Sequence, residues 1–290
     1  MKLYSLSCRR KIYEKTAFLV LNIATLFNGA LLLLIIYFLV ANGLKAISLE
    51  FLFQPPTDSM TKGGIFPCIM GTFLFCFVTI ITALPIGVAS AIYLNEYAAK
   101  GKTVRIIRMG INNLAGVPSI VFGLFGLAFF CTVLKMGVSI LAGGLTLAVM
   151  TLPIIIASSE EALKSVPDIY REASLAMGAT KWQTIYKIVL PAAFPGIITG
   201  AILGISRAAG ETAPIMYTGA VFFSPVMPSS PFDAVMALPY HIYVLATAGT
   251  NIEATRHLQY GTALVLIALV FGMNLFAIIL RYRIRKKIKL

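Results

Sequence analysis

The sequence predicts an all-α polytopic membrane protein with six transmembrane helices. Hydrophobic residues make up 59% of the chain and charged residues only 12%, which is far from the composition of a soluble globular domain. Several apolar runs are long enough to cross the ~30 Å hydrocarbon core of a bilayer. The basic residues, which give a net charge of +13, stand in short clusters beside these runs. This placement favours membrane topology over nucleic-acid binding as the reason for the charge.

The first predicted span follows a basic segment. An apolar run over about 17–41 comes after five Lys or Arg in residues 1–16. A cleaved signal peptide has a shorter apolar core of about 7 to 15 residues, so we expect a retained membrane anchor. Residues 1–64 thus comprise the cytoplasmic N-terminus, the first helix and an external loop. They precede a transmembrane domain, 65–280, and a basic tail, 281–290.

Five further apolar runs predict the remaining spans. They cover about 65–94, where Pro85 predicts a kink, and then 111–134, 137–157, 192–218 and 262–280. Residues 95–110 are predicted to be a basic hairpin loop. With the N-terminus inside, 19 of the 24 Lys and Arg fall on the cytoplasmic side and four fall outside. The positive-inside rule therefore predicts that both termini are cytoplasmic.

The long polar interruption at 158–191 has the signals of helix, glycine, helix. Ser158 with Glu161, and Thr180 with Gln183, have capping-box spacing, and Asp168 is placed to cap a helix that runs to Met177. Gly178 can end that helix in the left-handed conformation. Apolar residues at helical spacing give both helices a face for a partner, namely Ile169, Ala173 and Ala176 before the glycine and Trp182, Ile185, Tyr186 and Val189 after it.

The same stretch resembles the EAA loop of ABC importer permeases. The matching residues are Glu172, Ala173, Ser174, Gly178, Ile188, Leu190 and Pro191, with Ser174 in place of the third alanine. The resemblance implies a segment that docks on a separate ATPase, which binds ATP and Mg, whereas this chain binds no cofactor of its own. Periodicity alone also fits an amphipathic linker between two spans. Trp182 and Tyr186 are ATPase contacts or, equally, interfacial anchors.

Arg207 and Glu211 are charged residues within the fifth predicted span. An arginine there costs about 2.5 to 3.5 kcal/mol on insertion scales, so it should face protein or water beside a partner. Four residues apart on a helix, the two side chains lie on one face and can pair. Gly196, Gly200 and Gly204 share that face, which predicts close packing there. The pair either belongs to a passage or only fixes the rotation of the helix.

Two glycine-containing segments carry a narrower resemblance, which covers about 65–290. Residues 116–126, GVPSIVFGLFG, and 207–214, RAAGETAP, are similar to the A-type permease subunit of high-affinity phosphate ABC importers. The resemblance implies a five-helix core plus an extra first helix, with Arg207 and Glu211 in the phosphate path. It also implies a second permease subunit as a heterodimer partner, two cytoplasmic ATPases and an external phosphate-binding protein, in the cytoplasmic membrane of a bacterium or archaeon. Gly116, Pro118, Gly123 and Gly126 are interpreted as packing and kink residues.

The residues indicate no covalent chemistry in this chain. Gly101-Lys102-Thr103 imitates the end of a P-loop, but Glu96 stands where the first glycine is needed. His241 and His257 are interpreted as structural residues of an external loop, and the four cysteines as packing residues without metal-ligand spacing. The alternatives to phosphate import are a permease for another oxyanion or small solute, and a channel or signalling membrane protein without an ATPase.

Overall fold

The computed structural model describes residues 2–99, 101–248 and 252–287, and most of them are helical. The long helices are α1 (Lys2–Gly43), α3 (Phe66–Ile92), α6 (Ile140–Lys164), α9 (Leu190–Gly210) and α12 (Ile252–Lys287). The shorter ones are α2 (Leu49–Phe53), α4 (Lys102–Ala115), α5 (Ser119–Gly126), α7 (Asp168–Ala176), α8 (Lys181–Thr184), α10 (Ala213–Thr218) and α11 (Leu238–Thr247). Strands β1 (Pro56–Thr57) and β2 (Lys62–Gly63) form a small antiparallel hairpin.

Among the described residues, five helical stretches are long and apolar enough to cross a membrane. They are Tyr13–Ala46, Phe66–Tyr97, Ile140–Lys164, Lys181–Gly210 and Thr255–Ile284. A sixth crossing is present if Lys102–Ala115 and Ser119–Val133, which are bent by 101° at the break between them, count as one span. The predicted class of all-helical, multi-span membrane protein is therefore confirmed.

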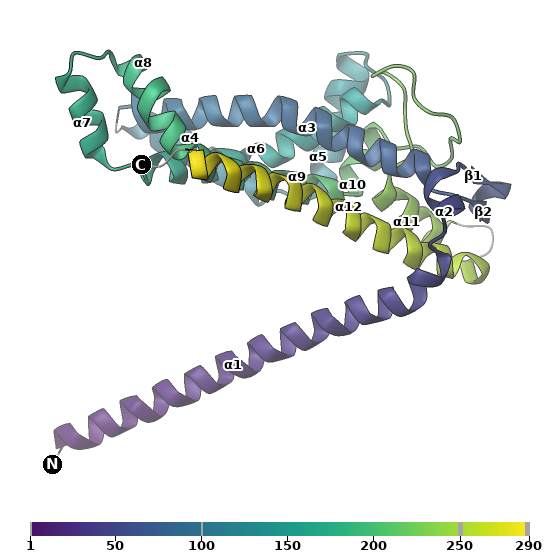
Figure 1. The fold of residues 1–290 in the computed structure, drawn as a ribbon, viewed down its shortest axis with the longest axis horizontal. Helices are drawn as coiled ribbons and strands as arrows, with labels where there is room; N and C mark the ends of the chain where they lie inside the picture. Colours follow the sequence, from purple (N-terminus) through teal and green to yellow (C-terminus); the bar gives the residue numbers. More distant parts are fainter. Residues whose placement is uncertain (1, 100, 249–251, 288–290) are drawn as a thin grey trace.

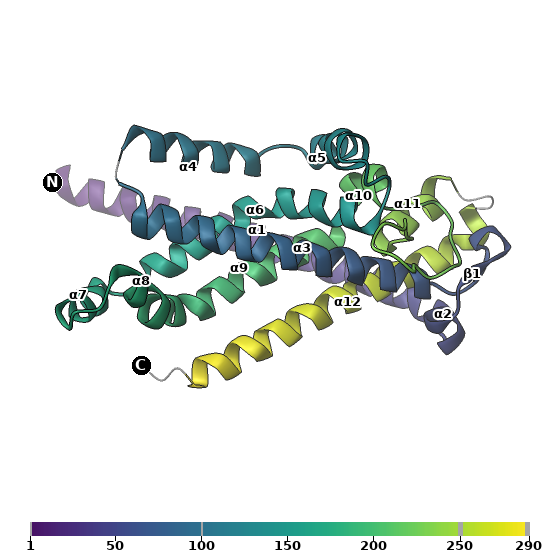
Figure 2. The same cartoon turned by 90° about the horizontal axis from the view of Figure 1, so that it is seen from above.

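Helix α6 packs against both α3 and α9, and the view in Figure 2 shows it between α4 and α9. It approaches α3 closely because Gly143 lacks a side chain, and a Cβ there would lie 2.5 Å from the Phe75 ring. The predicted glycine stripe of α9 faces α6, with Gly196 against Ala162, Gly200 against Ser158 and Gly204 against Ile155. Small residues thus set the helix spacing, as expected for helices that pack within a membrane.

The chain's charged segments gather at one end of the bundle. Helices α7 and α8, the beginning of α4 and the end of α12 lie at that end, while α2, the β1–β2 hairpin and α11 lie at the other (Figure 1). Helix α1 projects away from the bundle and meets α12 near its own C-terminal end, where Phe38 and Tyr260 pack edge to face at 5.3 Å. Cys68, Cys76 and Cys131 are buried free thiols, as expected for packing residues, and the side chain of Cys8 lies outside the described part.

The structure corrects the prediction for residues 95–134. The predicted hairpin loop 95–110 is largely helical, because α4 begins at Lys102, and the predicted third span 111–134 is broken at 116–118. Pro118 has no N–H to donate and disfavours the helical conformation at Val117, so the helix ends before it. The charged residues of this segment suggested a loop, whereas in the structure they lie on one face of the amphipathic helix α4.

Two boundaries around α9 also differ from the prediction. Helix α9 begins at Leu190, close to the predicted start of the fifth span at about 192, and ends at Gly210, so the predicted end at 218 is wrong. Glu211 is extended and α10 follows it as a separate short helix. Ser158 and Glu161 do not start a helix, because α6 continues to Lys164 and the Ser158 hydroxyl donates to the Ile155 carbonyl within it. Pro85 lies inside α3, which runs on to Ile92.

Candidate functional site

The segment between α6 and α9 has the predicted helix, glycine, helix form. Helix α7 ends at Ala176, and Gly178 has φ of +83°, the left-handed conformation expected of a helix stop. Thr180 then starts α8 with a complete capping box. Its hydroxyl accepts from the Gln183 N–H at 3.3 Å, and the Gln183 side chain accepts from the Thr180 N–H at 2.9 Å. Both local predictions are confirmed, and α7 and α8 form a compact unit at the end of the bundle (Figure 1).

The residues that match the EAA pattern have different environments in this unit. Glu172 and Ala173 are exposed on α7, whereas Ser174 is buried and its hydroxyl lies 2.8 Å from the Thr184 hydroxyl of α8. Ile188, Leu190 and Pro191 are half-buried where the segment enters α9. The serine that departs from the pattern therefore links the two helices, which an alanine could not do.

The predicted apolar faces divide between the bundle and the surface. Ile185 and Val189 are buried in the bundle. Trp182 and Tyr186 are exposed, with their rings stacked at 6.2 Å. Ile169 and Leu175 on α7, and Met177 directly after it, are also exposed. An apolar surface on α7 and α8 is thus open to a partner.

Arg171 fixes this unit to the bundle, a role that no pattern along the chain predicts. Its guanidinium donates to Glu96, just after α3, with a shortest distance of 2.9 Å. It also donates to the carbonyls of Leu163, in the last turn of α6, and Val166, two residues after that helix. Asp168 accepts from the same guanidinium at 3.1 Å. The side chains of Arg171 and Glu96 are only 16% and 7% exposed. Arg171 therefore connects the unit of α7 and α8 to two membrane helices through a buried, charge-assisted network.

Arg207 and Glu211 form the predicted pair, but the two residues do not both belong to a helix as predicted. The Arg207 Nε donates to Glu211 Oε1 at 3.4 Å, and the two side chains are 34% and 19% exposed. Glu211 is not part of the helix, because α9 ends at Gly210 and Glu211 has ψ of 132°. The pair therefore sits at the point where the helix stops, and an extended residue supplies the carboxylate.

The two glycine-containing segments of the sequence meet beside this pair. A Cβ at Gly123 of α5 would lie 3.0 Å from the Ala213 carbonyl oxygen and 3.1 Å from Pro214 Cα, so α5 packs directly on α10. Ala208 belongs to the same buried cluster as Phe122, and Val117 packs against that cluster. The packing role predicted for Gly123 is confirmed, and the break between α4 and α5 lies close to the charged pair.

Among the described residues there is no group of His, Cys, Asp or Glu that could hold a metal ion. His241 is not in a loop but in α11, where it is 4% exposed. Burial lowers the pKa of His241 to about 4, so its imidazole is neutral at physiological pH. His257 is exposed near the start of α12. The two histidines are therefore separate, and His241 contributes to the packing of the molecule.

A bundle of membrane-crossing helices, with the compact unit of α7 and α8 exposed at one end, is an architecture that suits a transport permease. A family model described as the inner membrane component of binding-protein-dependent transport systems matches residues 83–290, and the chain belongs to this family.

Relatives and solved structures agree with this assignment. The chain is 42% identical over 222 residues to a phosphate transport system permease protein of Mycobacterium leprae, covering 76% of this chain and 71% of that protein. It is 33% identical to a protein from Methanocaldococcus jannaschii described as a probable phosphate transport system permease, covering 97% of both. A bacterial ABC transporter involved in alginate import has the same fold, with a TM-score of 0.61 and 14% identity, covering 89% of this chain and 95% of that chain.

Proposed function

We propose that this chain is the permease subunit through which inorganic phosphate crosses the cytoplasmic membrane, driven by ATP hydrolysis on a separate subunit. Family membership and the two phosphate-transport relatives support this function. The observation that carries the substrate class is the half-buried Arg207 beside Glu211, placed where α9 stops. A guanidinium can bind two phosphate oxygens at once and keeps its charge at any physiological pH. Glu211 limits the net positive charge, so that the anion is not trapped.

The proposed complex contains a second permease subunit as a heterodimer partner, two cytoplasmic ATPases that hold ATP and Mg, and an external phosphate-binding protein. Residues 65–280 form the permease domain, in which the coupling segment 158–191 docks on an ATPase, and 281–290 form a cytoplasmic tail. The exposed Glu172 and Ala173 and the apolar residues of α7 suit such docking. Gly178, Ile188, Leu190 and Pro191 give the segment its shape and its connection to α9.

Neutralising the charged pair tests the phosphate path. The variants are Arg207→Gln, Glu211→Gln, the double variant and Arg207→Lys, with uptake of labelled phosphate and recovery of the intact complex as measurements. Each single neutral variant leaves an uncompensated charge and should lower recovery, whereas the double variant should assemble normally. We expect the double variant to lose uptake, because the forked donor is gone. Arg207→Lys should keep assembly and show reduced uptake.

A matched control is available in α12, where Glu253 and Arg256 form an exposed pair with their charged atoms 3.7 Å apart. Neutralising both residues removes the same charges and should leave uptake unchanged. If the Arg207→Gln/Glu211→Gln variant imports phosphate at the unmodified rate, the pair only fixes the helix and the phosphate path lies elsewhere. Competition by sulfate in the unmodified complex tests the alternative of another oxyanion, which requires sulfate to suppress phosphate uptake.

A further inference from the structure

Helix α4 has a polar face that cannot lie against lipid. Arg105, Arg108 and Asn112 follow one another at spacings of three and four residues, so they share one side of the helix, and Asn113 lies at its edge. The opposite side carries apolar residues, among which Ile106, Ile107 and Leu114 are exposed. Arginine and asparagine side chains along a membrane helix are costly in hydrocarbon and are found where they face protein or a water-filled cavity. The polar side of α4 therefore indicates a hydrated space.

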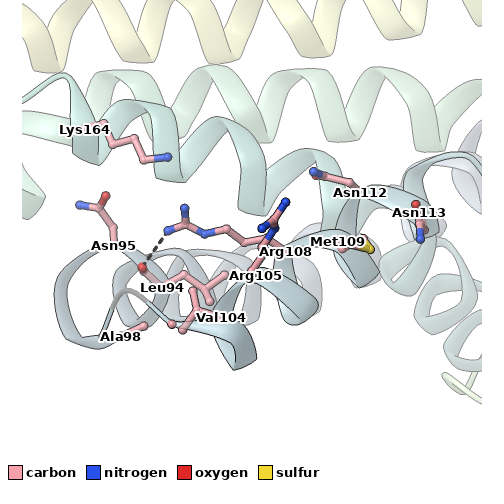
Figure 3. A pocket seen from close by; sticks show the side chains of 11 residues that line it. Leu94, Asn95, Ala98, Val104, Arg105, Arg108, Met109, Asn112, Asn113 and Lys164 are labelled. Carbon is pink, nitrogen blue, oxygen red and sulfur yellow. Dashed lines mark hydrogen bonds between the residues drawn. The ribbon is translucent and has the colours of Figure 1, made fainter.

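That space is a pocket of about 700 Å³ between α4 and the ends of α3 and α6 (Figure 3). Arg105, Arg108, Asn112 and Asn113 line it from α4, and the ammonium of Lys164 faces it from α6. No carboxylate is among the described residues that line it. The pocket thus presents three cationic groups and the side-chain amides of Asn95, Asn112 and Asn113 to any molecule that enters it.

Only part of this positive charge is neutralised by the protein. Glu160 behind the pocket lies 2.7 Å from Arg108 Nη2 and 2.9 Å from the Lys164 ammonium, so one carboxylate serves two cations. Glu160 and Glu161 line an adjoining depression, which shares Arg108, Asn112 and Lys164 with the pocket, so these two carboxylates lie beside a pocket with three cations. The guanidinium of Arg105 makes no hydrogen bond or ion pair with any described residue, and the buried Nε of Arg108 has no hydrogen-bond partner among them. The charge balance and the free donors both suit an anion.

We propose that this pocket binds a phosphate group on the cytoplasmic side of the permease, as a second site below the Arg207 pair. Arg105 and Arg108 are spaced to contact one tetrahedral anion together, with Asn112 as a neutral donor. The inference rests on the proposed function, because it takes the anion that leaves the passage to be phosphate. The headgroup of an anionic phospholipid offers the same chemistry from a second source.

The position of the pocket supports a role in release. Its Asn112 and Asn113 end adjoins the break between α4 and α5, where Val117 packs against the cluster that contains Ala208, the neighbour of Arg207. Its other end reaches Asn95 and Lys164, near the attachment of α7 through Glu96. An anion passing from Arg207 toward the unit of α7 and α8 would meet this pocket. Occupancy from the cytoplasmic side should then oppose further import.

The test uses the assembled importer in vesicles of phosphatidylcholine alone or with phosphatidylglycerol, with ATP and graded inorganic phosphate inside. Internal phosphate should inhibit uptake in the unmodified complex. Arg105→Gln should raise the internal phosphate concentration for half inhibition about tenfold, as expected for loss of one charge-assisted contact. Arg105 is the residue to change because it has no partner that would be left unpaired. Arg283→Gln, which removes an exposed charge at the same end of the molecule, is the matched control and should behave as the unmodified complex.

Equilibrium dialysis of labelled phosphate with the purified complex gives a reading that does not require transport. Weaker binding by Arg105→Gln, or weaker inhibition by internal phosphate, supports free phosphate as the ligand. Uptake that depends on phosphatidylglycerol in the unmodified complex but not in Arg105→Gln supports the lipid headgroup. Equal inhibition, equal binding and equal lipid dependence in both complexes would overturn the proposal. Failure of the unmodified complex to import phosphate would overturn the proposed function instead. The dialysis result would still show whether Arg105 contributes to a phosphate-binding site.

Discussion

Gly178 gives the unit formed by α7 and α8 its shape through its backbone conformation alone. Its φ of +83° is strained for a residue with a side chain, by about 1 to 2 kcal/mol, while nothing lies within 4 Å of a Cβ built there. We expect Gly178→Leu to insert into the membrane but to lose phosphate uptake and to weaken co-purification of the ATPase. Gly178→Asn is the control, since asparagine tolerates this conformation and should retain most uptake. Normal uptake by the leucine variant would remove the role assigned to the glycine.

Residues that stand out from their sequence neighbours, such as a glycine between two helices or a charge in an apolar run, could be identified from the sequence. Residues whose role depends on distant partners could not. Gly178 lies between two helix signals, and Arg207 is a charge in an apolar run, so spacing alone marked both. Arg171 and Glu96 are 75 residues apart, and each is an ordinary charge at the edge of a span. Their pairing exists only after α3 and α6 have packed, so no pattern along the chain predicts it.

At the level of elements, α7 is held to α3 and α6 by Arg171. Removing the guanidinium leaves Glu96 buried without its partner, which costs about 3 to 5 kcal/mol for such pairs. We expect Arg171→Gln to lower the melting temperature of the complex. We expect Arg171→Gln/Glu96→Gln to recover stability and still transport less phosphate per ATP hydrolysed, because α7 no longer moves with α3. Asp168→Asn is the control, as that carboxylate is 87% exposed, and a double variant with unmodified coupling would reduce Arg171 to a packing residue.

Helices were predicted correctly where one apolar run forms one helix. The prediction failed where a single apolar run contains two helices. The apolar residues on both sides of Pro118 read as one span, although the proline separates an amphipathic α4 from α5. The same happened at Gly210, where α9 stops and α10 begins within a single apolar stretch. Hydropathy averages over such breaks, and the chain's charged sites lie beside them.

The predicted orientation of the chain in the membrane rests on where its charged segments lie. The ends of α1 and α12 that carry the basic clusters lie at the same end as α7 and α8, opposite the β1–β2 hairpin (Figure 1). The distribution of Lys and Arg predicts that this end is cytoplasmic. Single cysteines at Lys15, Lys286 and Thr57 of a variant without the four native cysteines test it in intact cells. An impermeant thiol reagent added outside should label only Thr57→Cys, since it alone lies in the external loop, and labelling of Lys15→Cys and Lys286→Cys but not Thr57→Cys would mean that the chain is inserted the other way round.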